Sequence, residues 1–381
     1  MKTGIATVPL DYGRCPYWLF ERMKRLLRGI TIAIIEEFGS EEFLKRLSDP
    51  VWFQSLSAAS AMDWNSSGTT TITMGALKEA LRDLQLDLGV FICGGKKISR
   101  KTPEEIEKYS EILGLTQETS NKLIYTSKMV AKVDSSLIQN PLTPFQLYHH
   151  NFIFTKSGEW SVIQQSMSPI IQKARRYHWL SSKVSDFTQE PHSGIVVDVK
   201  SKPLNLVAKE SKRNKEISIE LVKEEPKTFL RDIKLISEKP NVLIRQKRFP
   251  GFCEMELNDV EFYHHPVEKE KFDLKRLEKT IFAAHFENPE NFERLLSLKG
   301  VGPKTIRALS LVSEIIYGAK PSYEDPARYS FSVGGKDGTP EFVDRRRYDT
   351  LLSIMEKGIK KAKISNREKI EAQRRLIKVY G

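Results

Sequence analysis

The strongest constraint on the fold is a short stretch between residues 295 and 309, where a pair of glycines separates two apolar segments. It reads Leu-Leu-Ser-Leu-Lys-Gly-Val-Gly-Pro-Lys-Thr-Ile-Arg-Ala-Leu. Glycine adopts positive φ at no steric cost, and proline suits the first turn of a helix, where its missing N–H is not needed. The stretch therefore predicts a helix, a tight turn over Gly300, Val301 and Gly302, and a second helix that begins at Pro303.

The same stretch predicts a phosphate site. A helix N-terminus beside uncovered backbone amides favours anions, and the nearby lysines and arginine add positive charge. The pattern resembles the helix-hairpin-helix motif, which holds the sugar–phosphate backbone of DNA without reading its sequence. The alternative is an ordinary turn between two helices, capped by glycine. The predicted DNA-binding residues are Lys299, Gly300, Val301, Gly302, Lys304, Thr305 and Arg307.

The charge distribution favours a polyanionic partner. The formal net charge is +12. Residues 201–250 contain 13 Lys and Arg against 7 Asp and Glu, and residues 351–381 contain 9 against 3. Two basic regions therefore flank the glycine pair, as expected for a nucleic-acid-binding chain. Solvated basic helices, or adaptation to heat, would produce a similar composition.

Composition also narrows the class of protein. Hydrophobic residues make up 40% of the 381, but no apolar run is long enough to cross a membrane. The first ten residues lack the features of a signal peptide. Cys15, Cys93 and Cys253 lie far apart and form no Cys-x-x-Cys pair. We expect a cytoplasmic globular protein with two or three domains.

Periodicity predicts an α+β (mixed α/β) N-terminal region followed by a mainly helical C-terminal region. The expected domains are 1–200, which contains the candidate catalytic residues, 201–270, which holds a basic helix and an extended linker, and 271–381, which holds the glycine pair and a basic helical tail. The expected helices are 17–38, 41–47, 75–84, 102–113, 117–132, 204–224, 274–286 and 348–379. The expected strands or extended segments are 69–73, 90–93, 146–155, 159–166, 195–199 and 242–256.

A second candidate site lies in the N-terminal region. Four histidines fall between residues 149 and 192, close in sequence to several carboxylates, and this donor set suits a Mn, Zn or Mg hydrolytic site. Lys173, Arg175 and Arg176 could hold the negative charge of a phosphodiester. The spacing matches no known ligand pattern, and histidines beside aromatic residues are often core residues. The predicted catalytic residues are His149, His150, His178, His192 and Asp134, with His149, His150 and His192 as candidate metal ligands.

A third pattern involves Lys304 and Asp325. In the helix-hairpin-helix DNA glycosylases, a lysine after the turn attacks the sugar and an aspartate about twenty residues later assists. A lysine at a helix N-terminus could act as such a nucleophile. Pro326 stands where a histidine often follows, however, and an aspartate before proline is ordinary turn chemistry. The glycine pairs at 94–95 and 334–335 lack the spacing of a nucleotide-binding loop and are expected to be surface turns.

Several stretches together resemble one family. They are LFERM at 19–23, TTTITMGALKEAL at 69–81, CGGK at 93–96, SRKTP at 99–103, YHH at 148–150, RRYHW at 175–179, PHS at 191–193 and SFSVGGKDG at 330–338. The chain is similar, over nearly its whole length, to the archaeal and bacterial family catalogued as domain of unknown function 763. The resemblance implies one α+β region followed by a DNA-binding hairpin, and no settled activity. The chain departs from the family at residues 10–13, where Leu-Asp-Tyr-Gly replaces an expected Leu-His-Gly-Gly.

Two hypotheses follow for function. The first is a metal-dependent nuclease of DNA repair or processing, in which the hairpin holds DNA and the N-terminal region cuts it with Mn or Mg. The second is a non-catalytic DNA-binding module of a repair assembly. A DNA glycosylase is a weaker third possibility.

Overall fold

A computed structural model describes residues 15, 17–60, 67–96, 101–140, 143–171, 173–197, 200–238, 272–330, 353, 355–361 and 365–380. The predicted segment 242–256, the glycine pair at 334–335 and the departure at 10–13 lie outside these residues. No helix in the described residues is long and apolar enough to cross a membrane.

The core element is a six-stranded sheet in the order β1-β3-β4-β5-β6-β8. All neighbouring strands are antiparallel except β6 and β8, which are parallel. The strands are β1 (Val90–Lys96), β3 (Gln146–Thr155), β4 (Trp160–Ser168), β5 (Lys173–Leu180), β6 (His192–Val197) and β8 (Tyr329–Ser330). The predicted β-hairpin at 146–166 is confirmed as β3 and β4, because its alternating apolar residues serve two covered faces of the sheet.

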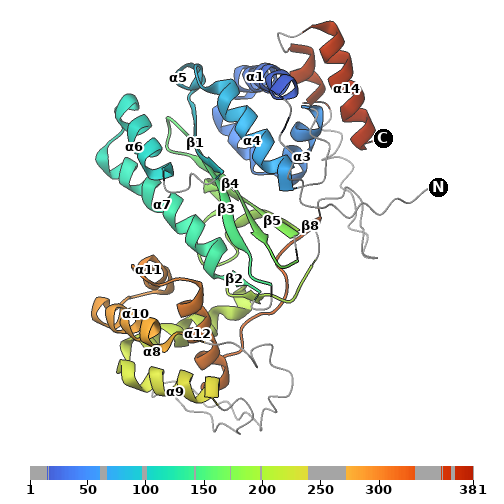
Figure 1. Ribbon diagram of the computed structural model, residues 1–381. Helices are drawn as coiled ribbons and strands as arrows, with labels where there is room; N and C mark the ends of the chain where they lie inside the picture. Colours follow the sequence, from blue (N-terminus) through green and yellow to red (C-terminus); the bar gives the residue numbers. More distant parts are fainter. Residues whose placement is uncertain are drawn as a thin grey trace, which may run out of the picture.

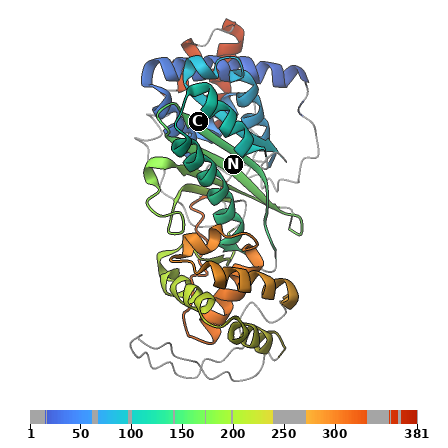
Figure 2. The ribbon, with the colours of Figure 1, turned by 90° about the vertical axis from the view of Figure 1, so that its left-hand side faces the viewer.

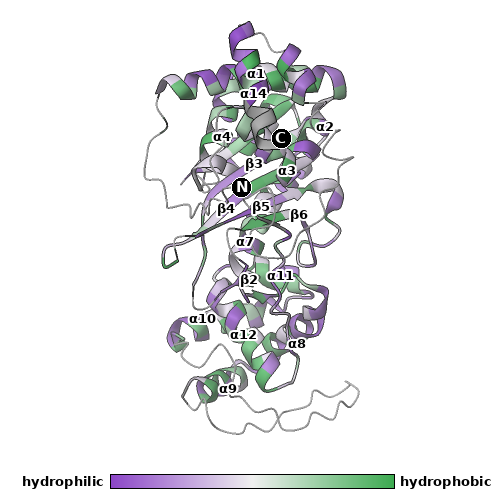
Figure 3. Ribbon diagram, turned by 90° about the vertical axis from the view of Figure 1, so that its right-hand side faces the viewer, coloured by the Kyte–Doolittle hydropathy of each residue, from purple (hydrophilic) through white to green (hydrophobic). Residues whose placement is uncertain are grey.

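One face of the sheet is covered by N-terminal helices. Ile92, Ile153 and Ile163 pack there against residues of the helices, and helical residues 355–361 and α14 join the same cluster. α1 alternates hydrophilic and hydrophobic stretches in Figure 3, as expected for a helix with one buried side. The N-terminal helices are α1 (Tyr17–Phe38), α2 (Ser40–Leu47), α3 (Pro50–Ala59), α4 (Ser67–Leu81) and the short α5 (Gln85–Leu88), and the C-terminal helix α14 (Asn366–Tyr380) packs against α3.

The opposite face is covered by α6 (Thr102–Leu113) and α7 (Gln117–Ser136). Phe91, Phe152, Phe154 and Trp179 pack on this side in a cluster that also takes in residues of α7. Along β3, Phe152 and Phe154 lie on this face, and Ile153 lies on the other. Figures 1 and 2 both show α7 running from the sheet into a second, mainly helical lobe.

The second lobe contains five helices in the described residues. They are α8 (Lys212–Lys223), α9 (Pro226–Glu238), α10 (Leu274–Glu287), α11 (Phe292–Ser297) and α12 (Pro303–Ile315). A small sheet of β2 (Ile138–Gln139) and β7 (Leu204–Asn205) links the C-terminal end of α7 to this lobe. The mixed α+β class is therefore confirmed.

Three local predictions are wrong. Residues 69–73 lie in α4 rather than in a strand. The predicted helix at 204–224 begins only at Lys212, after β7 and the 3₁₀ turn η2 (Lys209–Ser211). The glycines at 94 and 95 belong to the buried strand β1 rather than to a surface turn.

Candidate nucleic-acid interface

The segment between α11 and α12 has the local geometry that its glycines and proline predict. α11 ends at Ser297, Gly300 has φ of +90°, and Pro303 occupies the first turn of α12. Ile306 N donates to Gly302 O at 3.0 Å and so begins the helical ladder. The first N–H groups of α12 therefore have no acceptor inside the helix and face the turn.

The two glycines serve different purposes. Gly300 needs its positive φ, and a Cβ there would lie 3.5 Å from Thr280 Oγ1. Gly302 is extended, with φ of −154°, a conformation open to any residue. A Cβ at Gly302 would meet no atom within 4 Å. The fold itself therefore does not require glycine at residue 302, and the backbone there borders open space.

The seven predicted DNA-binding residues divide by exposure. Lys299, Gly300 and Lys304 are exposed, and Gly302 is half-buried. The side chains of Val301 and Thr305 are buried, so only their backbone groups could serve a ligand at the turn.

The prediction for Arg307 is wrong. Its side chain is 1% exposed and hydrogen bonds to the Tyr323 hydroxyl, whose pKa is raised chiefly by burial. Arg307 therefore lies inside the second lobe, where it cannot reach a phosphate at the turn.

α7 holds the turn in place through a residue that the sequence did not single out. Lys132 Nζ donates to the carbonyl oxygens of Leu296, Ser297 and Leu298 at 2.7, 3.1 and 2.7 Å. These are the last carbonyls of α11 and its C-cap, which lack donors inside the helix and attract a cation. Partial burial lowers the pKa of Lys132. A lysine in the middle of a long amphipathic helix gives no sequence signal for such a role.

Two further contacts fix the turn against its surroundings. Gln139 Nε2 donates to Pro303 O at 3.0 Å, from the strand that follows α7. Tyr125 Oη donates to Glu293 Oε1 at 2.7 Å, from an earlier turn of α7 to α11. Contacts from α7 and β2 thus hold the turn on one side, while Gly300 is exposed and the backbone at Gly302 borders open space.

The predicted catalytic histidines do not form one site, because they lie on both faces of the sheet. On the α7 face, His192 Nε2 lies 2.5 Å from Asp134 Oδ1, and Trp179 Nε1 donates to Asp134 Oδ2 at 3.0 Å. Gln164 Nε2 donates to the same carboxylate and to Val130 O. The Asp134 carboxylate, 2% exposed, is therefore enclosed by three donors.

His150 extends this network. Because the Gln164 amide nitrogen donates to Asp134, its oxygen accepts from His150 Nδ1 at 2.7 Å. The His150 Nε2 is then an acceptor for the Ser127 hydroxyl at 3.1 Å. Burial lowers the pKa of His150 and so favours its neutral form. We name this chain, formed by Ser127, His150, Gln164, Asp134, His192 and Trp179, the Asp134 network.

His178 lies on the other face. Its Nδ1 donates to Leu47 O at 3.1 Å, and its Nε2 accepts from Arg176 Nε at 2.9 Å. Burial lowers the pKa of His178 well below its usual value. Arg176, a predicted phosphate clamp, is buried on the ring of Phe53 at 4.6 Å, and burial lowers its pKa to about 9.

His149 lies on the same side of β3 as Ile153, the side that the N-terminal helices cover, and it is 2% exposed. Neither ring nitrogen makes a hydrogen bond of ordinary geometry within the described residues. Burial, with a smaller effect of His150, lowers the pKa of His149 to about 3, against a weak opposing effect of Asn151. No group of three or more His, Cys, Asp or Glu in the described part of the chain could hold a metal ion. The predicted ligand set is therefore not assembled there.

Asp325, the predicted glycosylase partner of Lys304, has another role in the fold. Its Oδ2 accepts from Arg175 Nη2 at 2.6 Å and from Ser201 N at 3.0 Å, and both charged side chains of the ion pair are 3% exposed. Oδ1 accepts from Ala327 N. Arg175, also predicted to hold the charge of a phosphodiester, is therefore paired inside the protein. The ion pair joins the segment before β8 to β5.

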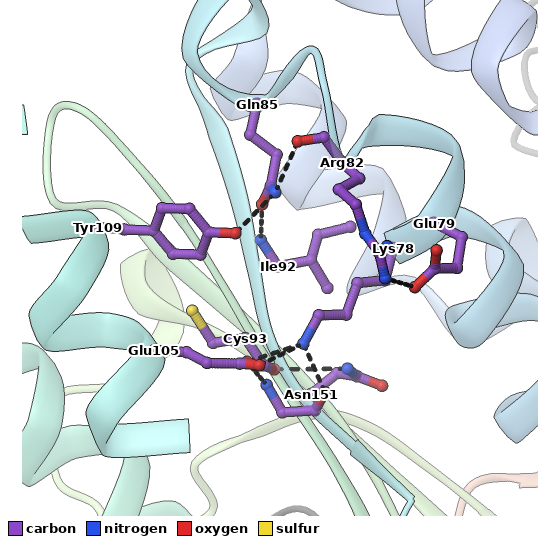
Figure 4. A network of polar contacts seen from close by, with 10 residues as sticks. Lys78, Glu79, Arg82, Gln85, Ile92, Cys93, Glu105, Tyr109 and Asn151 are labelled. Atoms are coloured by element: carbon purple, nitrogen blue, oxygen red, sulfur yellow. Dashed lines mark hydrogen bonds and ion pairs between the residues drawn. The ribbon is translucent and has the colours of Figure 1, made fainter. Parts of the chain in front are cut away.

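Another polar network lies where α4, β1 and α6 meet (Figure 4), and it explains the glycine at residue 94. Lys78 Nζ, from α4, donates to Gly94 O at 2.9 Å and to both Glu105 carboxylate oxygens. Glu105 Oε2 accepts from Gly94 N at 2.6 Å. A Cβ at Gly94 would lie 2.2 Å from His150 O, so only glycine fits. This network joins α4, β1 and α6, and it pairs the Gly94 amide and the Lys78 ammonium with Glu105.

Comparison with known proteins identifies a family. No curated protein and no solved structure is similar enough to be counted as a relative. A family model described as "Protein of unknown function (DUF763)" matches residues 4–343. The match spans both lobes of the structure, so the chain belongs to the DUF763 family.

Proposed function

We propose that this protein binds DNA through the sugar–phosphate backbone, with the α11–α12 turn acting as a helix-hairpin-helix motif. The observation that carries the proposal is the open backbone at Gly302, between exposed Lys299 and Lys304, at the N-terminus of a 13-residue helix. Such a site supplies backbone donors and positive charge to a phosphate and reads no bases.

The function that the geometry supports best is binding rather than cutting. The predicted catalytic side chains are buried and lie on two faces of the sheet, and the hydrogen bonds that they make are to other buried side chains and to the backbone. These features favour the interpretation of the N-terminal lobe as a scaffold, and of the whole chain as a DNA-binding module that serves a repair or processing assembly.

The proposal is tested with labelled 20-nucleotide DNA, single-stranded and duplex, by fluorescence anisotropy at several salt concentrations. We expect sequence-independent binding that weakens steeply as salt rises. Replacing Gly302 with alanine should weaken binding about tenfold, because the methyl group occupies the space that a phosphate needs and displaces a charge-assisted hydrogen bond. The extended backbone of Gly302 accepts alanine, so the variant should unfold at the wild-type temperature.

Absence of binding to any DNA in 50 mM salt would refute the proposal. Equal affinity of the wild type and the Gly302→Ala variant would refute the role of the turn.

Metal-dependent nuclease activity is tested on the same DNA with Mn or Mg added. If cleavage occurs and is abolished in His149→Ala, His150→Ala and His192→Ala variants that still fold, the protein is the nuclease that the histidines first suggested. If DNA is bound but remains intact with either metal, the binding module is supported.

A further inference from the structure

α10 lies directly beside the α11–α12 turn, and two contacts fix their relation. The Thr280 hydroxyl oxygen is 3.5 Å from the place where a Cβ would stand at Gly300. The Lys304 ammonium lies 5.9 Å from the centre of the Phe272 ring, just before α10. The turn and the start of α12 therefore pass along the N-terminal half of α10, from Thr280 toward Phe272.

Arg276 occupies the middle of this path. Phe272, Arg276 and Thr280 follow one another at intervals of four residues, so they share one side of α10 and its entry. Thr280 is near Gly300 and Phe272 is near Lys304. Arg276 thus flanks the intervening residues of the turn, including Gly302, where the backbone borders open space.

The side chains on this part of α10 are positively charged and exposed. Lys275, Arg276 and Lys279 are all exposed, and the described part of the chain places no carboxylate within ion-pair distance of any of them. Two acidic residues lie nearby. Asp273 caps the helix by accepting from Arg276 N at 3.1 Å, and Glu278 is two positions from Arg276, on another side of the helix.

These three charges form no ion pair with the described residues. Exposed charges contribute little to stability, even when they are paired. Three exposed cations within five residues, next to an open helix N-terminus, create a field that attracts an extended anion. A single phosphate could occupy the turn alone, whereas a polynucleotide also carries phosphates beyond it.

We propose that Arg276 and Lys279 of α10 form a second phosphate-binding surface, continuous with the turn, and that the ligand is a polynucleotide strand whose neighbouring phosphates contact both. This inference rests on the proposed function and extends it. The turn holds one phosphate with backbone amides, and α10 holds the next with side chains. The partner is thus defined as an extended nucleic-acid backbone rather than a mononucleotide.

The test compares Arg276→Gln and Lys279→Gln with a matched control, Lys108→Gln. Lys108 is an exposed residue of α6, in the other lobe. Each change removes one positive charge from the surface of a helix. The affinity for a labelled 20-nucleotide duplex, and for the single strand, is measured by fluorescence anisotropy between 50 and 300 mM salt. Circular dichroism confirms that each variant is folded.

We expect Arg276→Gln and Lys279→Gln each to weaken binding by about three- to tenfold at low salt. The slope of log affinity against log salt should fall by about one for each phosphate that the variant no longer neutralises. The Lys108→Gln variant should keep the wild-type slope. A wild-type slope in both α10 variants would overturn the inference, as would an equal loss of affinity in the control.

The same series separates this inference from the function on which it rests. If Gly302→Ala weakens binding and both α10 variants do not, the turn binds DNA and the α10 surface is refuted. If the wild-type protein binds no DNA at all, both proposals fail together.

Discussion

The α11–α12 turn and the Asp134 network are both rich in polar groups, but they differ in what surrounds those groups. In the turn, Gly300, Lys299 and Lys304 are exposed, and the backbone at Gly302 borders open space. In the network, each donor meets an acceptor inside the protein, and the Asp134 carboxylate is enclosed. A polar group that is buried and fully paired stabilises the fold, whereas one left open at the surface remains available to a ligand.

This difference teaches that residue type alone is a poor guide to function in this chain. Histidine and aspartate stand out in the sequence because they are common in active sites. In the structure Asp134, His150 and His192 join α7 to the sheet instead. The four predictions below either strengthen this contrast or break it, and they run from the largest expected effect to the smallest.

The largest effect concerns acid stability and His149. Its pKa in the folded protein is about 3, below its ordinary value of 6.5. Between pH 6.5 and 3, His149 is therefore protonated in the unfolded chain but not in the folded protein. The free energy of unfolding falls as the pH drops through this range. This residue alone lowers the free energy of unfolding by about 1.4 kcal/mol for each pH unit in that window.

The measurement is urea unfolding of the wild type and His149→Gln at pH 7, 6, 5 and 4. The stability of the variant should fall less steeply, by about 1.4 kcal/mol per pH unit. Parallel curves would show that His149 is protonated in the folded protein, and hence that it is more open than the structure indicates. His150 and His178, whose pKa values are also lowered, should act in the same direction.

The second prediction tests whether the Asp134 network is structural. Asp134→Ala removes the acceptor of His192, Trp179 and Gln164 at once. We expect a decrease of about 3–5 kcal/mol in the free energy of unfolding, as for other broken buried pairs. DNA affinity of the folded variant should stay at the wild-type value. A stable variant with weaker DNA binding would instead place Asp134 in a functional site.

Much of the fold could be predicted from sequence because the signals are local. The helix at 17–38, the β-hairpin at 146–166 and the helix start at Pro303 depend on periodicity, on a Ser-Gly turn and on proline. The error at residues 69–73 shows the limit. A run of threonines favours a strand by intrinsic propensity, but α4 buries Met74, Ala76 and Leu77 against its neighbours, and that packing prevails.

The sites were less predictable because they depend on contacts between distant residues. Asp134 and His192 are 58 positions apart and meet only because α7 lies across the sheet. The sequence favours a surface position for Arg307, yet every residue of α12 from Thr305 to Ser313 is buried. A helix that is enclosed on all sides has no exposed side for periodicity to reveal. The turn itself was predictable because glycine and proline act locally.

The third prediction concerns the charges of the turn. Lys299→Glu combined with Lys304→Glu should weaken DNA binding about 100-fold at 50 mM salt, because two attractions to phosphate become repulsions. Lys108→Glu combined with Lys122→Glu is the control, since both residues are exposed on α6 and α7 and the net charge changes equally. If both double variants bind equally weakly, then the overall charge attracts DNA and the turn has no special role.

The fourth and smallest effect concerns Lys132. This residue lies on α7, the helix that carries Asp134, and it contacts the end of α11 next to the turn. Lys132→Met keeps the aliphatic stem but removes three hydrogen bonds to the carbonyls of α11 and its C-cap. We expect a decrease of about 1–2 kcal/mol in unfolding free energy, since Lys132 is only half-buried and water can replace part of the interaction. DNA affinity should fall about two- to fivefold, because the turn is held less firmly in its binding geometry.

Lys128→Met, an exposed position one turn earlier on α7, is the matched control and should change neither quantity. If Lys132→Met lowers stability and leaves affinity intact, α7 supports the lobe without positioning the turn. The contrast between scaffold and binding surface would then be sharper still, because the binding geometry of the turn would not depend on Lys132.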